Sequence, residues 1–339
     1  MIDWRSVNVS SFSRSTLLLS LLLCAGCPPA AVSVRPYPAP TAPELLAQLQ
    51  RSRAQIQTLR AYAKADYMDR GQRVKIDLAL LAERPQKLRL AGENSLTGPL
   101  LTVATDGNEF HLLDVRENRF LRGQVNPCNM SRILGLTLHP SQLIEVLMGG
   151  TPLLPDATES DVSWDPREGG RDVLTLRNAR GISEVLRFSR LPSPSTGSGV
   201  AAIQSPGSWD LREAEGKNAL GTVLWRLRHE DFSWQRIQAA GSADSAGPQV
   251  DDATAGSVRV PSVTYLEDPP RKSDVRLRWR EREWNVAIDA KLFQLDAPEG
   301  IPVEPDTCSL PPTLPSPAPT PAPSPAPTPT RDRPEVSPP

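Results

Sequence analysis

The sequence predicts a mainly β fold with helices (α+β class), built around one long antiparallel sheet. Three changes in the spacing of apolar residues predict it. Helical spacing over 42–58 gives way to alternation of apolar and polar residues over 61–120. Helical spacing returns over 130–147, and alternation resumes between 173 and 288. We expect about five strands before the central helices and about six after them, in a sheet that must curl and cover its apolar face.

Residues 1–26 have the pattern of a secretory signal peptide. Arg5 and Arg14 precede a short apolar run that ends in small residues. That run is well below the roughly 20 residues that a membrane-spanning helix needs. The segment 23–27 (LCAGC) resembles a bacterial lipobox, and the resemblance implies that Cys27 is lipidated and becomes the first residue of the mature chain. An ordinary signal peptide is the alternative.

Proline divides the rest of the chain into regions. The sequence has 36 prolines in 339 residues, about twice the usual share. They crowd 27–40, which we interpret as a Pro/Ala-rich tether, and 309–339, which we interpret as a disordered Pro-rich tail. Residues 41–308 between them suffice for one large β domain. The net charge of -1 and the lack of a basic cluster argue against a nucleic-acid partner.

The helix expected over 42–58 has its own start signal. Thr41 can accept a hydrogen bond from the amide of Glu44 in a capping box, and Pro43 falls in the first turn, where no donor is lost. Short helices are also expected on either side of His139-Pro140, because apolar residues recur there at helical spacing. These central helices would interrupt the series of strands.

The clearest hairpin is expected near the end of the domain. Residues 275–279 alternate Val, Leu and Trp with arginine, and 284–288 alternate Trp, Val and Ile with polar or small residues. Residues 281–283 would form the turn between these two strands. On this interpretation Trp279, Trp284 and Val286 face the same side of the sheet.

The four cysteines divide into two pairs. Cys24 leaves with the signal peptide, and Cys27 carries the lipid. Cys128 and Cys308 remain, and in an oxidising compartment they are expected to form a disulfide bond. Two free buried thiols are the alternative.

The order of helix, strands, helices and strands resembles the LolA/LolB lipoprotein-carrier family, and the lipobox makes the chain most similar to LolB-like outer-membrane lipoproteins. The residues that carry the resemblance are 61–64 (AYAK), 84–90 (RPQKLRL), 105–120 and the helical pair around 134–147. The resemblance implies an unclosed, strongly curved half-barrel of about 11 strands, with an N-terminal helix and mid-chain lid helices over an apolar cavity for acyl chains. The loops 191–207 and 239–256 and the Pro-rich tail depart from the family.

Two sets of residues are expected to serve that role. Six side chains are expected to face the inside of the sheet, either as plain core or as the wall of a cavity: Phe110, Leu112, Trp225, Trp279, Trp284 and Val286. Leu96 is the large apolar residue of the loop 92–99, where the membrane-anchored family member exposes an apolar residue that helps to deliver cargo. Leu96 either folds back onto the sheet or stands in solvent.

Nothing in the sequence predicts catalysis, a cofactor or a metal. His111, His139 and His229 are isolated, and no Cys, His or carboxylate cluster has ligand spacing. No nucleophile elbow or phosphate-binding loop is present in the sequence. A non-enzymatic protein is expected.

The resemblance implies an outer-membrane-anchored lipoprotein, facing the periplasm, that binds acyl chains and accepts or inserts lipoproteins or lipid. Pro28, not Asp, follows Cys27, which favours the outer membrane under the enterobacterial sorting pattern. The expected partners are acyl chains or lipoprotein cargo, a periplasmic lipoprotein carrier and the inner leaflet of the outer membrane, with the protein as a monomer. The alternative is a structural or assembly lipoprotein that binds a protein partner in the cell envelope, with the tail as a spacer.

Overall fold

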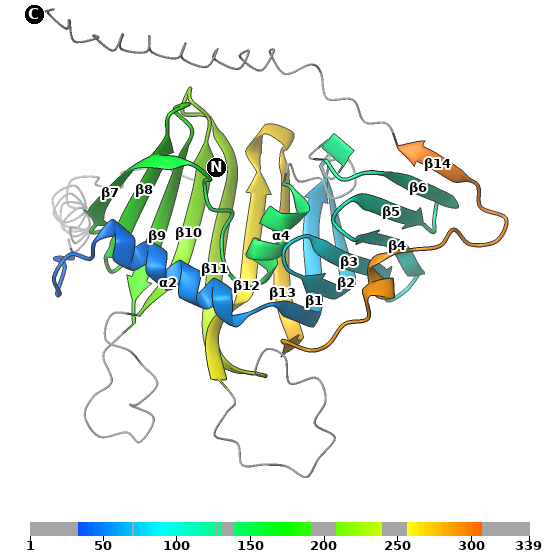
Figure 1. Ribbon diagram of the computed structural model, residues 1–339, viewed down its shortest axis with the longest axis horizontal. Helices are drawn as coiled ribbons and strands as arrows, with labels where there is room; N and C mark the ends of the chain where they lie inside the picture. Colours follow the sequence, from blue (N-terminus) through cyan, green and yellow to red (C-terminus); the bar gives the residue numbers. More distant parts are fainter. Residues whose placement is uncertain are drawn as a thin grey trace, which may run out of the picture.

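The computed structural model describes residues 33–69, 71–126, 128–129, 138–191, 208–238 and 256–306 (Figure 1). The signal peptide, Cys27, Cys308 and the Pro-rich tail lie outside the described residues. So do most of the two long loops and the first of the two expected mid-chain helices.

Fourteen strands form one sheet, in which the first six make an antiparallel meander. These are β1 (Thr58–Asp69), β2 (Gln72–Glu83), β3 (Lys87–Asn94), β4 (Gly98–Thr105), β5 (Glu109–Asp114) and β6 (Arg119–Gln124). A second antiparallel series comprises β7 (Ala157–Asp165), β8 (Arg171–Asn178), β9 (Ser183–Arg190), β10 (Trp209–Lys217), β11 (Val223–Ile237), β12 (Gly256–Asp268) and β13 (Ser273–Trp284).

The two series join in the middle of the sheet, where β1 pairs with β13. The short strand β14 (Val303–Asp306) adds to β6 in parallel. The sheet therefore runs from β14 to β7, and among the described residues these two end strands do not pair with each other. In Figure 1 the strands turn progressively across the sheet. The expectation of a mainly β fold with an unclosed, curved sheet is confirmed.

The expected count of about 11 strands is wrong, because several strands lack the alternation that was sought. The end strand β7 exposes most of its side chains, so it needs no apolar face. Strand β12 contains Pro261, a residue that is disfavoured in the middle of a sheet. Pro261 lies opposite Phe232 of β11, whereas pairing of β12 with β13 begins only at Val263. Pro261 therefore lies outside the part of β12 that pairs with a strand on both sides.

The expected C-terminal hairpin is also wrong. Strand β13 continues through 281–283, and its preceding turn is the 3-10 segment η2 (Pro269–Arg271). Arg280 is an extra residue in a bulge opposite Tyr62 and Ala63. The bulge lets both Trp279 and Trp284 face the core although they are five residues apart in the sequence. The alternation of inward and outward side chains shifts by one residue at this bulge and not at a turn. Val286 lies after the end of the strand.

Two α-helices, α2 (Ala42–Gln55) and α4 (Pro140–Leu147), lie on the same side of the sheet (Figure 1). The capping box between Thr41 and Glu44 is present: the backbone N–H of Thr41 donates to Oε2 of Glu44 at 2.7 Å. Among the described residues, the expected lid of mid-chain helices is represented by α4, because the other expected helix lies largely outside them. α2 extends across the strands, whereas α4 is a short helix with five of its eight residues buried.

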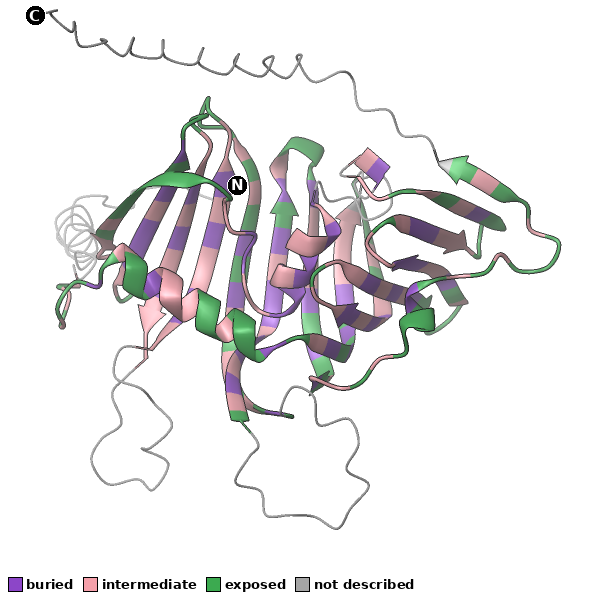
Figure 2. Cartoon of the chain, viewed as in Figure 1, coloured by how far each residue is buried: buried purple, intermediate pink, exposed green. Residues whose placement is uncertain are grey.

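The core lies between these helices and the inner face of the sheet. Its buried apolar residues come from α2, α4, β1–β3 and β8–β13. Figure 2 shows the alternation of buried and exposed residues along these strands. The outer face carries many ion pairs, such as Lys64 with Asp77 at 3.1 Å. One dry face and one polar face are what an antiparallel sheet with a single core requires.

The described part of the expected tether is docked on the sheet. The indole Nε1 of Trp164 donates to the carbonyl of Ser33 at 2.7 Å, and Tyr37 donates from its hydroxyl to Asp172 at 2.9 Å. Arg35 forms an ion pair with the same carboxylate at 3.0 Å. Asp172 is fully buried. Residues 33–40 are therefore part of the folded domain and not a free spacer.

Candidate ligand cavity

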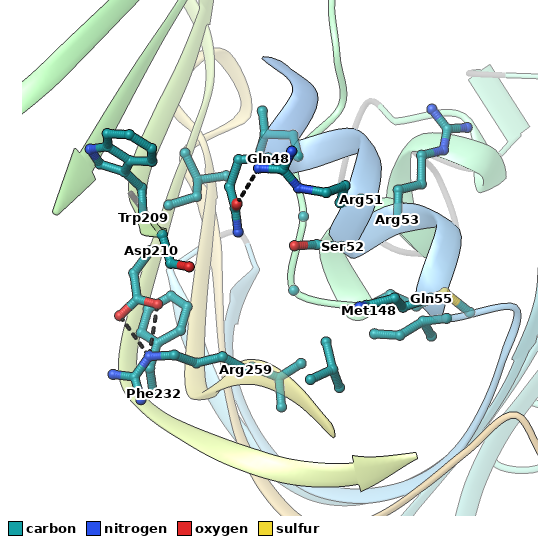
Figure 3. A pocket seen from close by; sticks show the side chains of 18 of the residues that line it. Gln48, Arg51, Ser52, Arg53, Gln55, Met148, Trp209, Asp210, Phe232 and Arg259 are labelled. Carbon is teal, nitrogen blue, oxygen red and sulfur yellow. Dashed lines mark hydrogen bonds and ion pairs between the residues drawn. The ribbon is translucent and has the colours of Figure 1, made fainter. Parts of the chain in front are cut away.

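A cavity of about 340 Å³ lies between α2, the chain that follows α4, and strands β10–β12 (Figure 3). Its apolar lining comes from all three parts: Leu49, Ile56, Met148, Leu153, Leu191, Leu211, Phe232, Trp234, Val258 and Val260. Helix α2 forms the roof, from which Gln48, Ser52 and Gln55 face the hollow. Its volume falls in the range of about 300–1,000 Å³ that small-ligand sites have.

Two arginines share one buried carboxylate at the floor of the cavity. Asp210, which is buried, accepts from Nε of Arg259 at 2.9 Å and pairs with Arg212 at 3.1 Å. The Arg212 guanidinium lies 4.6 Å from the ring centroid of Phe232. Burial lowers the pKa of Arg212, while Asp210 opposes that shift. Each of these charged groups thus has a partner of opposite sign, and the rest of the floor is mainly aromatic and aliphatic.

A second group of charges fixes the roof. Glu145 of α4 pairs with Arg53 of α2 at 3.1 Å and also bonds Arg84, from the turn between β2 and β3. Arg84 donates in addition from Nε to the carbonyl of Ile56 at 2.8 Å. Burial lowers the pKa of Arg84, and the Glu145 carboxylate acts against that shift. One carboxylate thus ties α2, α4 and a strand turn together at one side of the cavity.

The segment after α4, residues 148–153, forms one wall of the cavity. Two buried titratable residues hold this wall in place. His229 of β11 bonds the carbonyl of Gly150 at 2.9 Å. Glu184 of β9 accepts from the backbone N–H of Leu154 at 2.7 Å and from the hydroxyl of Thr151 at 3.1 Å. Burial lowers the pKa of His229 to about 4 and raises the pKa of Glu184 to about 8.

Gly149 lets this wall begin directly after α4. Its φ of 84° is strained for any other residue, and a Cβ there would lie 2.9 Å from Cδ of Pro261. The helix can therefore end against β12 and turn at once into the wall.

The six residues expected to line a cavity do not line this one. Trp279 and Trp284 do face inward, but they are packed in the core at 8% and 2% exposure. Trp225 is partly buried against the core, beside Gly216. The remaining three are Phe110, which is fully buried on β5 outside this core cluster, half-buried Leu112, and Val286, whose carbonyl accepts from Thr58 at 2.6 Å.

Several lining residues were missed in the sequence, and some left a signal. Val258 and Val260 are β-branched residues at alternate positions, a spacing that indicates a strand. The glycine- and serine-rich composition of the preceding loop obscured where this strand begins. Nothing local could show that α2 crosses over it.

Leu96 stands in solvent with 94% of its side chain exposed, at the tip of the β3–β4 hairpin. Oδ1 of Asn94 accepts from the backbone N–H of Leu96 at 2.9 Å and of Thr97 at 3.3 Å. The turn is thus held by its own side chain. Of the two alternatives for Leu96, the structure shows the exposed one.

The histidines are separate from one another. His139 caps α4, and His111 accepts from the N–H of Leu295 at 3.1 Å. Within the described ranges, no group of three or more His, Cys, Asp or Glu side chains could hold a metal ion. Cys128 is disulfide-bonded, and its bond to Cys308 stays a prediction because Cys308 lies outside the described residues. The pairing of Asp306 with Gly123 does bring the chain that leads to Cys308 close to the segment that contains Cys128.

The fold and cavity define a curved open sheet with a helix-roofed hollow, and three solved structures are similar to it. One is a LolA superfamily protein from Nitrosomonas europaea, with 12% identity, a TM-score of 0.44, and coverage of 76% of this chain and 99% of that chain. Another is a putative outer membrane lipoprotein-sorting protein domain from Vibrio parahaemolyticus, with 10% identity, a TM-score of 0.42, and coverage of 73% and 95%. A DUF1329 family protein from Desulfovibrio piger has 9% identity, a TM-score of 0.43, and coverage of 73% and 95%.

No protein-family model matches the sequence, and no curated protein matches it either. In the part of the chain that the structure describes, no helix has the length and apolar character to cross a membrane.

Proposed function

We propose that the protein is an outer-membrane-anchored lipoprotein that holds an acyl chain in the cavity beneath α2 and accepts or inserts lipoproteins or lipid. The observation that carries the proposal is the cavity itself, a hollow with a largely apolar floor beneath a helix. Aromatic and aliphatic groups such as Phe232 and Val258 suit a hydrocarbon chain, and the nearby Asp210 and Arg259 are held in an ion pair.

Transfer of an acyl chain needs no chemical step. Each buried methylene contributes about 0.8 kcal/mol, and the same gain is available in a bilayer. Relative affinities for carrier, acceptor and membrane then set the direction. We therefore propose a non-enzymatic protein without a cofactor, which receives cargo from a periplasmic lipoprotein carrier and releases it to the inner leaflet.

Two features would place the cavity near that membrane. Cys27, if lipidated, anchors the chain by acyl groups. Leu96, exposed at a hairpin tip, offers an apolar side chain that can enter a bilayer surface. Exposure of a single leucine is common on protein surfaces, so its role depends on a direct test.

A cavity-filling substitution tests the proposal. Ser52 faces the cavity from α2, and Ser52→Trp places an indole in the space proposed for the chain. Gln50→Trp is the matched control, because Gln50 is exposed on the same helix and does not line the cavity. We expect the wild-type full chain to bind a fluorescent fatty acid. Gln50→Trp should bind it equally well, and Ser52→Trp should lose most of the binding.

Equal binding by the two variants would show that the cavity is not the acyl site. Mass spectrometry of the purified protein gives a second measure. Extracted phospholipid or acylated peptide supports the proposal, whereas one stoichiometric protein partner and no lipid supports the alternative of a structural or assembly lipoprotein.

A further inference from the structure

A second hollow, of about 560 Å³ and more open, adjoins the cavity. One side is formed by Pro38, Ala39 and Pro40 of the docked N-terminal segment, and the other by the first turns of α2. Arg51 and Trp209 line both hollows. The two hollows therefore meet at these two residues.

Two arginines of the second hollow lack an acidic partner among the described residues. Arg51 is exposed on α2, and its guanidinium donates to the neutral Oε1 of Gln48 at 2.9 Å. Arg190, at the end of β9, lies 4.3 Å from the ring centroid of Tyr37 and 5.7 Å from that of Trp209. These contacts hold the guanidinium in place but leave its charge uncompensated.

The neighbouring arginines are different. Arg35, Arg53 and Arg259 each form an ion pair with a carboxylate, at 3.0, 3.1 and 2.9 Å. Glu44 is the acidic residue that lines the second hollow, and its carboxylate accepts from the N–H and hydroxyl of Thr41. Arg51 and Arg190 are therefore the guanidinium groups of the second hollow that an anionic ligand could pair with.

We propose that the two hollows together bind an anionic amphiphile. The acyl chain lies in the cavity beneath α2, and its carboxylate or phosphate lies between Arg51 and Arg190, beside Trp209. This inference rests on the proposed function, since it requires the chain in the cavity. Guanidinium groups bind carboxylate and phosphate oxygens through charge-assisted hydrogen bonds, and Arg190 is already oriented by its two aromatic neighbours.

Matched pairs of amphiphiles test the proposal by calorimetric titration of the full chain. Dodecanoate is compared with dodecanol, and lauroyl lysophosphatidic acid with monolauroylglycerol, so that each pair shares a chain and differs in charge. We expect the anionic member to bind about tenfold more tightly, the order of one or two charge-assisted hydrogen bonds in a partly exposed site. The pair with the larger difference in affinity between its charged and neutral members shows whether the carboxylate or the phosphate is preferred.

Two variants locate the effect. Arg51→Gln and Arg190→Gln are each expected to remove most of the preference for the anionic member while binding of the neutral member stays unchanged. Arg51 is exposed, so its variant keeps the fold even if loss of Arg190 loosens the packing around Tyr37. Arg278→Gln, at an exposed residue of β13 that lines neither hollow, is the control.

The outcomes separate the two proposals. Equal affinity for charged and neutral members overturns the anionic site and leaves the acyl cavity standing. A preference that survives in both Arg51→Gln and Arg190→Gln also overturns it, because the charge then binds elsewhere. Failure of every amphiphile to bind rejects the acyl cavity and with it this inference.

Discussion

His229 and Gly150 are joined by a hydrogen bond of 2.9 Å, from the imidazole Nε2 of a buried strand residue to the backbone carbonyl that follows α4. The carbonyl can only accept, so Nε2 carries the proton and Nδ1 accepts from the Thr264 hydroxyl at 3.2 Å. Trp279 donates in turn to Thr264 at 3.4 Å. The core of β11–β13 thus fixes the wall of the cavity through a chain of hydrogen bonds.

We expect this histidine to make the protein acid-sensitive. Burial lowers the pKa of His229 to about 4, from 6.5 in a free histidine, so the folded state favours the neutral ring. The contribution of neutral His229 to the free energy of unfolding is complete above pH 6.5. It is lost as the pH falls from 6.5 towards 4, by about 1.4 kcal/mol per pH unit. Urea unfolding of the wild type and of His229→Gln across this range measures it. Identical pH slopes for the two proteins would contradict the expectation.

Glu184 should give a dependence of the opposite sign. Burial raises its pKa to about 8, so the folded state favours the protonated acid. Its contribution is complete below the ordinary value of 4.5 and is lost as the pH rises through 8. Glu184→Gln retains an acceptor for the N–H of Leu154 and does not titrate. We expect this variant to gain stability relative to the wild type between pH 5 and pH 8, as followed by thermal unfolding at each pH. No relative gain would mean that the carboxylate ionises at its usual pH.

Removal of Glu145 should be costly. Glu145→Ala leaves Arg84 buried without its carboxylate, since the side chain of Arg84 is only 10% exposed. We expect a loss of about 3 kcal/mol in the free energy of unfolding. Glu283→Ala is the control, because its ion pair with Arg60 is exposed and should contribute less than about 1 kcal/mol. Equal losses in the two variants would show that Glu145 does not compensate a buried charge.

Local features of the sequence sufficed for the capping box at Thr41 and for the alternation in β1–β6, because both depend on residues close together in the chain. They did not suffice where long-range contacts decide. The bulge at Arg280 forms only because β13 pairs with β1, more than 200 residues away. The inward direction of Trp279 could be predicted, but whether the space around it is packed or hollow depends on where α2 crosses the sheet.

The docking of residues 33–40 depends on one such long-range contact. Asp172 accepts from Tyr37 and Trp209 and pairs with Arg35, and burial together with the Asp172 contact raises the pKa of the Tyr37 hydroxyl. We expect Asp172→Ala to release this segment, which would be measured as faster amide hydrogen exchange over residues 33–40. Asp165→Ala, which removes the more exposed pair with Arg167, is the control and should leave exchange in this segment unchanged. Unchanged protection of this segment in Asp172→Ala would show that other contacts suffice.

A docked segment also shortens the connection to the membrane. If Cys27 carries the anchor, five residues separate it from Ser33, and the six Cα-to-Cα steps between the two span at most roughly 20 Å. The β7 end of the sheet would then stay close to the bilayer, and Leu96 would have to reach the same surface by tilting of the whole domain. Insertion of a flexible spacer between Cys27 and Ser33 tests whether this short connection matters for delivery.

Leu96 itself can be tested with little risk to the fold, because its side chain makes almost no contact. We expect Leu96→Glu to leave the melting temperature unchanged and to reduce transfer of an acylated cargo to vesicles by about tenfold, since a charge now faces the bilayer. Thr97→Glu adds the same charge to the same exposed turn but keeps the leucine. Its transfer rate should remain near that of the wild type. If both variants slow transfer equally, the charge near the membrane matters and the leucine does not. If neither slows it, the hairpin tip has no part in delivery.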